Sequence, residues 1–186
     1  VVSMSSSVKV SVVIVTYNRH HDCKETLESL LVQSVLPHEI IVVDDCPSTP
    51  FRYGHPLVKI VRNDRELGLS GSRNVGIRLS GGDVVAFIDD DALATQNWIE
   101  TIRQAFNDCV DIIGGPVLPL YLTQPPRWWS DKQFGLNIGI TNEAIIGCNF
   151  AVRKELFNRV GYFNTQVGRK YGKLLSGEED EFFQRA

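Results

Sequence analysis

Clustered carboxylates follow two short apolar segments of the chain. Residues 39–43 lead directly into Asp44 and Asp45, and residues 83–88 lead into three consecutive aspartates, Asp89, Asp90 and Asp91. Neighbouring carboxylates repel one another and resist ionisation unless a cation or hydrogen-bond donors compensate their charge. Oxygen ligands of this kind suit Mg²⁺ or Mn²⁺, and such a cation would in turn hold a diphosphate. The triple aspartate is the stronger candidate, because an aspartate pair also suits the capping of a loop.

A third acidic cluster lies within residues 176–185 and contains Glu178, Glu179 and Asp180. Acidic residues are common in the first turn of a helix, where they interact favourably with the helix dipole. A carboxylate is also the simplest acceptor for a hydroxyl proton, so one of these residues is a candidate general base. The residues alone leave both interpretations open.

The apolar pattern predicts the elements that position these carboxylates. Short apolar runs at residues 8–16 and 83–88 are typical of buried strands, and further strands are predicted at 39–43 and 58–61. Helices are predicted at residues 22–33, with Asp22 as N-cap, and further along at 73–79, 96–106, 153–160 and through Phe182 and Phe183. Strands that alternate with helices in short order indicate a parallel sheet with right-handed crossovers. Ligands of such sheets bind beyond the carboxyl ends of the strands.

Residues 68–72 are rich in glycine and serine and predict a turn before the helix at 73–79. Gly71 and Gly76 have the spacing of a Walker-type loop, but Ile77 and Arg78 replace the lysine and hydroxyl residue that touch phosphate and metal. The sequence contains no G-x-G-x-x-G, so Walker NTPases and classical dinucleotide-binding proteins are both excluded. What remains is a turn into a helix from which Arg73 can reach a phosphate.

Composition excludes several other classes. The 186 residues carry 19 basic and 22 acidic side chains, a formal charge of −3, so no nucleic-acid partner is expected. No run of 18 apolar residues is present, which excludes a transmembrane helix and predicts a soluble domain. The four cysteines form no C-x-x-C pair, so we expect reduced, mostly core thiols and a cytoplasmic location. The histidines lack metal-site spacing and are expected on the surface or in loops; they are His20, His21, His38 and His55.

Four segments in order resemble the family 2 glycosyltransferases: VVIVTYNR at residues 12–19, IVVDD at 41–45, GSRN at 71–74 with GGD at 81–83, and FIDDDA at 87–92. GCNFAVR at 147–153 and GEED at 177–180 are similar to the family's acceptor-side segment and base helix. The resemblance implies the GT-A fold, a Rossmann-like α/β architecture with a mostly parallel central sheet flanked by helices. It divides the chain into a disordered tail (1–7), a nucleotide-sugar-binding half (8–113) and an acceptor-side half (114–186) that is truncated at its C-terminus.

Roles for individual residues follow from this resemblance. It implies that Asp45 hydrogen-bonds the nucleobase, that Arg73 lies near the sugar-diphosphate, and that Asp91 ligates the metal with Asp89 at the ribose or the metal. Asp90 belongs to the same donor-binding group, as does the strand end that lines the base pocket, Val15, Thr16 and Tyr17. Glu179 takes the position of the base, although Glu178 and Asp180 stay open because the usual Glu-Asp pair is altered here. Cys46 stands where the family often has glycine.

The acceptor side is less defined. Trp128 and Trp129 offer flat apolar faces on which a sugar can stack, and packing in the core is the alternative for both. Asn149 is assigned to the acceptor site by the resemblance, which also implies a glycan or lipid-linked acceptor and allows peripheral membrane association. It leaves the oligomeric state open.

The implied function is an inverting glycosyltransferase that uses Mn²⁺ or Mg²⁺ and a nucleotide-diphosphate sugar, with a UDP-sugar favoured, in polysaccharide or glycan assembly. One alternative is a nucleotide-sugar-binding domain or fragment without turnover of its own. Another is a phosphoacceptor domain of the receiver type, because an aspartate pair after a strand also occurs there. Its strand order fits poorly, and no suitably placed lysine follows a late strand.

Overall fold

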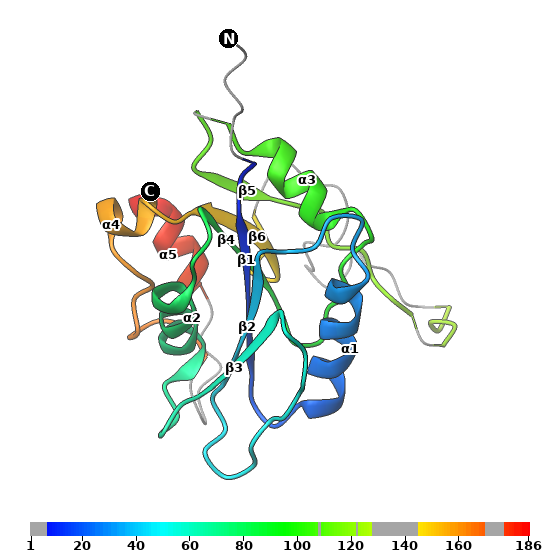
Figure 1. Ribbon diagram of the computed structural model, residues 1–186. Helices are drawn as coiled ribbons and strands as arrows, with labels where there is room; N and C mark the ends of the chain where they lie inside the picture. The colour runs from blue at the N-terminus through cyan, green and yellow to red at the C-terminus, as the bar shows by residue number, and fades with distance from the viewer. Residues whose placement is uncertain (1–6, 108, 122, 128–144, 170–176) are drawn as a thin grey trace.

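In the part of the chain that the structure describes, six strands form a single sheet in the order β3-β2-β1-β4-β6-β5 (Figure 1). The structure is a computed structural model that describes residues 7–107, 109–121, 123–127, 145–169 and 177–186. The first four strands are parallel: β1 (Val10–Thr16), β2 (Glu39–Asp44), β3 (Val58–Arg62) and β4 (Val84–Ile88). The last two are β5 (Ile112–Gly114) and β6 (Asn149–Arg153), and β6 runs antiparallel to both β4 and β5. The sheet is therefore mostly parallel, as predicted.

Helices cover both faces of this sheet (Figure 1). One face packs against α1 (His20–Leu31) and α3 (Trp98–Ala105), and the other against α2 (Gly68–Leu79), α4 (Leu156–Val160) and α5 (Glu178–Arg185). Successive residues of β1 point to opposite faces, so Val12 and Ile14 join the first core and Val13 joins the second. Burial on both faces explains why β1, β2 and β4 are largely apolar, whereas the edge strand β3 has no buried residue and carries the exposed Lys59 and Arg62.

The pairing register places the ends of three parallel strands at one edge of the sheet. Thr16, the last residue of β1, lies beside Asp44, the last residue of β2. On the other side of β1, Val13 pairs with Phe87, so Asp90 reaches the level of Thr16 just beyond β4. The aspartate clusters predicted from the sequence therefore share this carboxyl edge.

Several helix starts differ from the prediction, among them those of α1 and α2. Helix α1 begins at His20 instead of residue 22, and Asp22 is not its N-cap but lies in its first turn, where it accepts a hydrogen bond from Arg19 Nε at 3.3 Å. Helix α2 begins at Gly68 and absorbs the predicted turn at 68–72. Its first amides have an acceptor that sequence proximity does not reveal, the carboxylate of Asp45 at the end of β2.

Strands β5 and β6 were not predicted, and the helix expected at 153–160 is shorter, because residues 149–153 form β6 and α4 starts at Leu156. The run Phe150-Ala151-Val152 is buried by pairing with β4, more than 60 residues away in sequence. Short apolar runs do not reveal whether a strand partner exists at such a distance.

Cysteines and histidines depart in part from their expected environments. All four thiols are free, but only Cys23 and Cys46 are buried, whereas Cys109 is exposed and Cys148 is half-buried. The expectation of mostly core thiols is therefore wrong for Cys109. His20 is a helical residue whose ring packs edge-on against Phe51, with 5.5 Å between ring centroids, so it is not a surface or loop residue.

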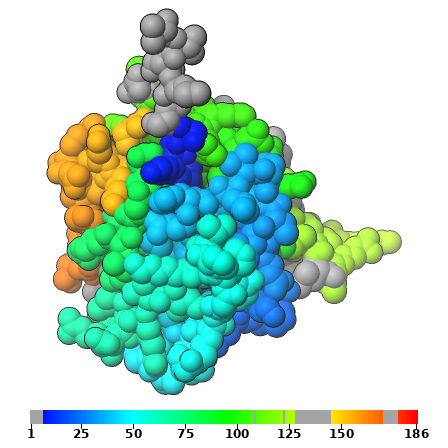
Figure 2. Space-filling view, viewed as in Figure 1, coloured from blue at the N-terminus to red at the C-terminus, as the bar shows by residue number. Residues whose placement is uncertain are grey.

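Residues 118–121 and 123–127 project from the body of the molecule (yellow-green in Figure 2). Leu118 and Leu120, each 68% exposed, lie in this projection. Among the described residues, no helix has the length and apolar character needed to cross a membrane.

Candidate active site

The three aspartates after β4 have different environments. Asp90 is buried, and its Oδ2 accepts a hydrogen bond from Thr16 Oγ1 at 2.8 Å. The Asp90 carbonyl accepts a second one from Thr26 Oγ1 at 3.0 Å, which ties the strand end to α1. Asp89 and Asp91 instead have 43% and 47% of their side chains exposed. The buried carboxylate of Asp90 thus lies in sequence between two accessible carboxylates, those of Asp89 and Asp91.

Arg19, which follows β1, neutralises part of this charge. Its Nη2 lies 2.5 Å from Asp91 Oδ2 and its Nη1 lies 3.2 Å from Asp90 Oδ1. The hydrogen bond to Asp91 favours the charged form of Arg19 and is the main reason why the pKa of Arg19 is raised. Burial raises the pKa of Asp90 to about 6, and the Thr16 hydroxyl and the Arg19 charge oppose this shift. Sequence reasoning did not single out Arg19, although a basic residue directly after a strand at this edge was a visible signal.

Asp89 and Asp91 suit a divalent cation that is shared with a substrate. Desolvation by the surrounding protein raises the pKa of Asp89, and the Arg73 guanidinium 3.6 Å away opposes that shift. Within the described ranges, no group of three or more His, Cys, Asp or Glu side chains is placed to hold a metal. Mg²⁺ commonly binds through one or two carboxylates, with substrate phosphates and water completing its shell. Two accessible carboxylates at one strand end fit that pattern and do not fit an all-protein cage.

Asp44 and Asp45, in contrast, are buried and bonded to their own chain. Asp44 accepts hydrogen bonds from the Cys46 amide at 3.1 Å and the Phe51 amide at 2.8 Å, which shapes the loop between them. Asp45 accepts three: from Asn63 Nδ2 at 2.7 Å and from the amides of Leu67 and Gly68 at 2.9 and 2.8 Å. The pair therefore caps loops and the start of α2, and the contact of Asp45 with a nucleobase stays a prediction.

Arg73 is buried in the second half of the site. Its Nη1 lies 3.0 Å from Glu178 Oε1, and its Nη2 donates to the Gly147 carbonyl at 2.9 Å. Its guanidinium carbon also lies 5.5–5.9 Å from the centres of three aromatic rings, those of Phe87, Phe150 and Phe163. The proximity of Arg73 to a sugar-diphosphate stays a prediction; the contacts described place its charge between Asp89 and Glu178.

The three candidate bases on α5 differ in their surroundings. Glu178 is buried and paired with Arg73, whereas Asp180 is exposed. Glu179 is half-buried, and its Oε2 is buried without a hydrogen-bond partner among the described residues. Desolvation raises the pKa of Glu179, and the negative charge of Glu178 adds to this shift. The backbone amide of Glu179 and the charge of Arg73 oppose the shift. An atom added as Cβ at Gly147 would lie 2.1 Å from Glu179 Oε1, so this carboxylate rests directly on a glycine.

The remaining predicted residues lie around the same edge or outside the described ranges. Val15 is half-buried beside Val43, Thr16 is bonded to Asp90, and Tyr17 is 41% exposed. Trp128 and Trp129 lie outside the described residues.

Asn149 has a structural role whether or not it meets an acceptor. Its Oδ1 accepts from Trp98 Nε1 at 2.8 Å, and its Nδ2 donates to the Pro116 carbonyl at 2.9 Å. It thereby joins β6 to α3 and to the chain beyond β5. The contribution of Asn149 to an acceptor site stays a prediction.

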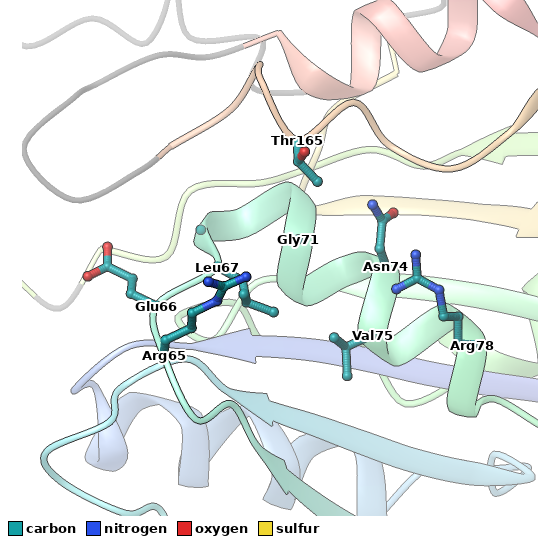
Figure 3. Close-up of a pocket in the computed structure, with 9 residues that line it drawn as sticks. Arg65, Glu66, Leu67, Gly71, Asn74, Val75, Arg78 and Thr165 are labelled. Carbon is teal, nitrogen blue, oxygen red and sulfur yellow. The ribbon is translucent and has the colours of Figure 1, made fainter.

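A separate cavity of about 580 Å³ lies along α2 and contains none of the predicted site residues (Figure 3). It is lined by Arg65, Glu66, Leu67, Gly68, Gly71, Asn74, Val75, Arg78 and Thr165. Asn74 exchanges two hydrogen bonds with the backbone of Phe163, and the Arg78 guanidinium lies over the ring of Tyr162. These two polar side chains of the cavity wall therefore already contact other parts of the protein. The clustered carboxylates, not this cavity, therefore define the candidate active site.

Solved structures show the class of fold. The chain superposes on the TarS fragment 1–349 of S. aureus in complex with UDP-GlcNAc with a TM-score of 0.68 and 21% identity, covering 96% of this chain and 53% of that one. It superposes on the mannosyltransferase PcManGT of Pyrobaculum calidifontis, in complex with GDP-Man and Mn²⁺, with a TM-score of 0.65 and 21% identity, covering 88% and 50%. The fold is that of the GT-A glycosyltransferases, as the sequence predicted.

Sequence comparison identifies the family. The profile described as Glycosyl transferase family 2 matches residues 11–163. The glucosyl-dolichyl phosphate glucuronosyltransferase of Haloferax volcanii is 34% identical over 190 residues, which cover 92% of this chain and 61% of that protein. The chain belongs to glycosyl transferase family 2, and it spans about 60% of the length of this relative.

Proposed function

We propose that this chain carries the donor site and the general base of an inverting glycosyltransferase, which moves a sugar from a nucleotide-diphosphate sugar to an acceptor hydroxyl. One observation carries the proposal. Arg73 connects the accessible carboxylate Asp89 with the helix start that holds Glu179, whose Oε2 is buried and has no hydrogen-bond partner among the described residues. A cation-binding edge and a proton acceptor are thus held by one buried side chain.

The residues divide the chemistry between them. Asp89 and Asp91 would hold Mn²⁺ or Mg²⁺, which supplies charge stabilisation for the departing nucleoside diphosphate. Glu179, in its ionised form, accepts the proton of the acceptor hydroxyl while the oxygen attacks the anomeric carbon. The bond from that carbon to the diphosphate oxygen breaks on the opposite face, so the configuration inverts. Burial raises the pKa of Glu179 and so makes its carboxylate a stronger base.

The compared proteins support the substrate class. Two structural neighbours hold UDP-GlcNAc and GDP-Man, the latter with Mn²⁺, and the Haloferax relative is named for a dolichyl-phosphate-linked sugar. We infer a nucleotide-diphosphate sugar donor, with UDP-sugars favoured, and a glycan or lipid-linked acceptor. A lipid-linked acceptor would bring the protein to the cytoplasmic face of a membrane.

Donor binding and turnover test this function separately. Thermal unfolding with UDP-, GDP- and dTDP-sugars, each with and without Mn²⁺, identifies the donor, because a ligand that binds only the native state raises the unfolding temperature. With that donor, Asp91→Asn is expected to lower turnover roughly 100- to 1000-fold, the usual cost of losing a group that stabilises developing charge. Asp64→Asn, a change in an exposed loop, is the matched control.

Wild-type turnover in Asp91→Asn would contradict the metal role. Binding of a nucleotide sugar with no transfer to any acceptor would instead support the alternative function, a nucleotide-sugar-binding domain.

A further inference from the structure

We propose that Arg73 and Glu178 form a positioning pair, which holds the first turn of α5 so that Glu179, and neither of its neighbours, serves as the base. This inference rests on the proposed function. It also goes beyond it, because it assigns to Arg73 a task distinct from binding the donor.

The pair is enclosed by protein. Both side chains are only 4% exposed, and their charged atoms lie 3.0 Å apart. Two buried charges are stable only when each is paired and its remaining hydrogen-bonding groups are satisfied. Glu178 satisfies one nitrogen of Arg73, the Gly147 carbonyl accepts from another, and the rings of Phe87, Phe150 and Phe163 surround the guanidinium. If Arg73 turned away, Glu178 would lose its buried partner, and if Glu178 turned away, Arg73 would keep only Asp89, 3.6 Å from its Nη2.

The start of α5 depends on this pair. Gly177 precedes the helix with a φ of +99° and offers no side-chain cap, and Glu178 is the first helical residue. The bond from Glu178 to Arg73 therefore anchors the first turn to α2 at the other side of the site. It leaves the helix no freedom to rotate a different carboxylate into the place of Glu179.

The same arginine also fixes the surface on which the base rests. Its second nitrogen holds the carbonyl of Gly147, and the Glu179 carboxylate lies against the Cα of this glycine. One guanidinium thus sets both the position of the helix that carries the base and the position of the backbone beneath it. Because Glu178 is the buried ionic partner of Arg73, proton acceptance by Glu178 would neutralise the charge that compensates this guanidinium.

Charges around Glu179 give this arrangement a measurable signature. Glu178 raises the pKa of Glu179 and Arg73 lowers it, and Asp89 is the charged group across the site that interacts with Glu179. Glu178→Gln removes one negative charge while keeping an acceptor for Arg73, so the pKa of Glu179 falls. A base is active when ionised, so the acidic limb of the kcat profile moves to lower pH. Loss of stability alone would lower the active fraction without moving this limb.

Three variants and one control test the pair. Arg73→Lys keeps the charge but loses the planar fork, and is expected to lower kcat roughly 10- to 100-fold, because small displacements of a catalytic group are costly. Gly147→Ala pushes the Glu179 carboxylate aside while keeping both side chains of the pair, and is expected to lower kcat similarly. Both should keep a donor Kd close to wild type by calorimetry. Gly54→Ala, where an added Cβ meets nothing within 4 Å, should match wild type.

Titration of Glu179 by carboxylate NMR in wild type and Glu178→Gln needs no substrate and separates the two levels of inference. One combined result overturns the positioning pair. In it, the wild type transfers sugar, Glu178→Gln and Arg73→Lys leave kcat unchanged, and the titration of Glu179 does not move. A large loss of donor affinity with intact kcat in Arg73→Lys also overturns it, since Arg73 would then act on the donor. A wild type that binds no donor and transfers no sugar contradicts the proposed function, while the titration still decides whether Glu178 acts on Glu179.

Discussion

The two aspartate clusters look alike in the sequence and differ in what surrounds them. Both follow apolar parallel strands and reach the same edge of the sheet. Asp45 receives three hydrogen bonds from the chain and is buried, whereas Asp91 is half-exposed and contacts the side chain of Arg19. Donors supplied by loops decide whether a carboxylate at such an edge serves the fold or remains accessible to a ligand. The difference lies in the partners, not in the aspartates.

Asp45→Ala should produce the largest effect on stability. It leaves the Asn63 amide and the Leu67 and Gly68 amides without their acceptor, and each buried donor left unsatisfied costs about 1–3 kcal/mol. We expect the free energy of unfolding in urea to fall by about 3–4 kcal/mol, allowing for partial rescue by water. Asp91→Asn, measured alongside, should stay within about 0.5 kcal/mol of wild type because its site is exposed. Similar losses in the two variants would remove the distinction between the clusters.

Asp44→Asn is expected to have a smaller effect. The carboxylate accepts from two amides, those of Cys46 and Phe51, and an asparagine side chain can replace one acceptor oxygen but not both. The expected loss is about 1–2 kcal/mol in the same unfolding measurement. A loss equal to that of Asp45→Ala would show that the number of donors does not set the contribution of each aspartate.

Arg19→Gln gives the smallest expected effect and tests the accessible cluster. Without a bound cation, the Arg19 guanidinium donates a hydrogen bond to Asp91 Oδ2. A divalent cation that binds this oxygen must displace the guanidinium. An exposed ion pair of this kind is worth up to about 1 kcal/mol, so its removal should tighten Mn²⁺ binding by up to about fivefold. Calorimetry with Mn²⁺ alone measures this change, and Arg52→Gln, an exposed arginine in another loop, controls for net charge. Weaker Mn²⁺ binding in Arg19→Gln would show that Arg19 does not compete with the cation.

Local sequence patterns were sufficient for the parallel half of the fold. Strands β1, β2 and β4 are apolar runs buried on both faces, and their order places the aspartates at one edge. The early start of α2 was missed because its first amides bond to Asp45, more than 20 residues upstream. Strands β5 and β6 were missed because their identity depends on partners distant in sequence.

The grouping of the carboxylates was predictable from the sequence, but the surroundings of each single carboxylate were not. Neighbouring residues of a helix point in directions about 100° apart, so Glu178, Glu179 and Asp180 face different surroundings although they are adjacent. Which one is buried and paired depends on where Arg73 lies, over 100 residues earlier in the chain. The contact between Gly147 and the Glu179 carboxylate likewise has no signal in the local sequence.

The reversed direction of β6 has a consequence for how such a protein can change. Gly114 at the end of β5 pairs with Phe150, and Asn149 at the start of β6 pairs with Ile88 at the end of β4. The chain therefore leaves the sheet after β5 and returns at β6 along the same edge that carries Asp89. Insertions, deletions or exchanges within residues 115–148 therefore need not disturb the register of β1 to β4. One strand running backwards thus lets the chain at this edge change independently of the parallel strands.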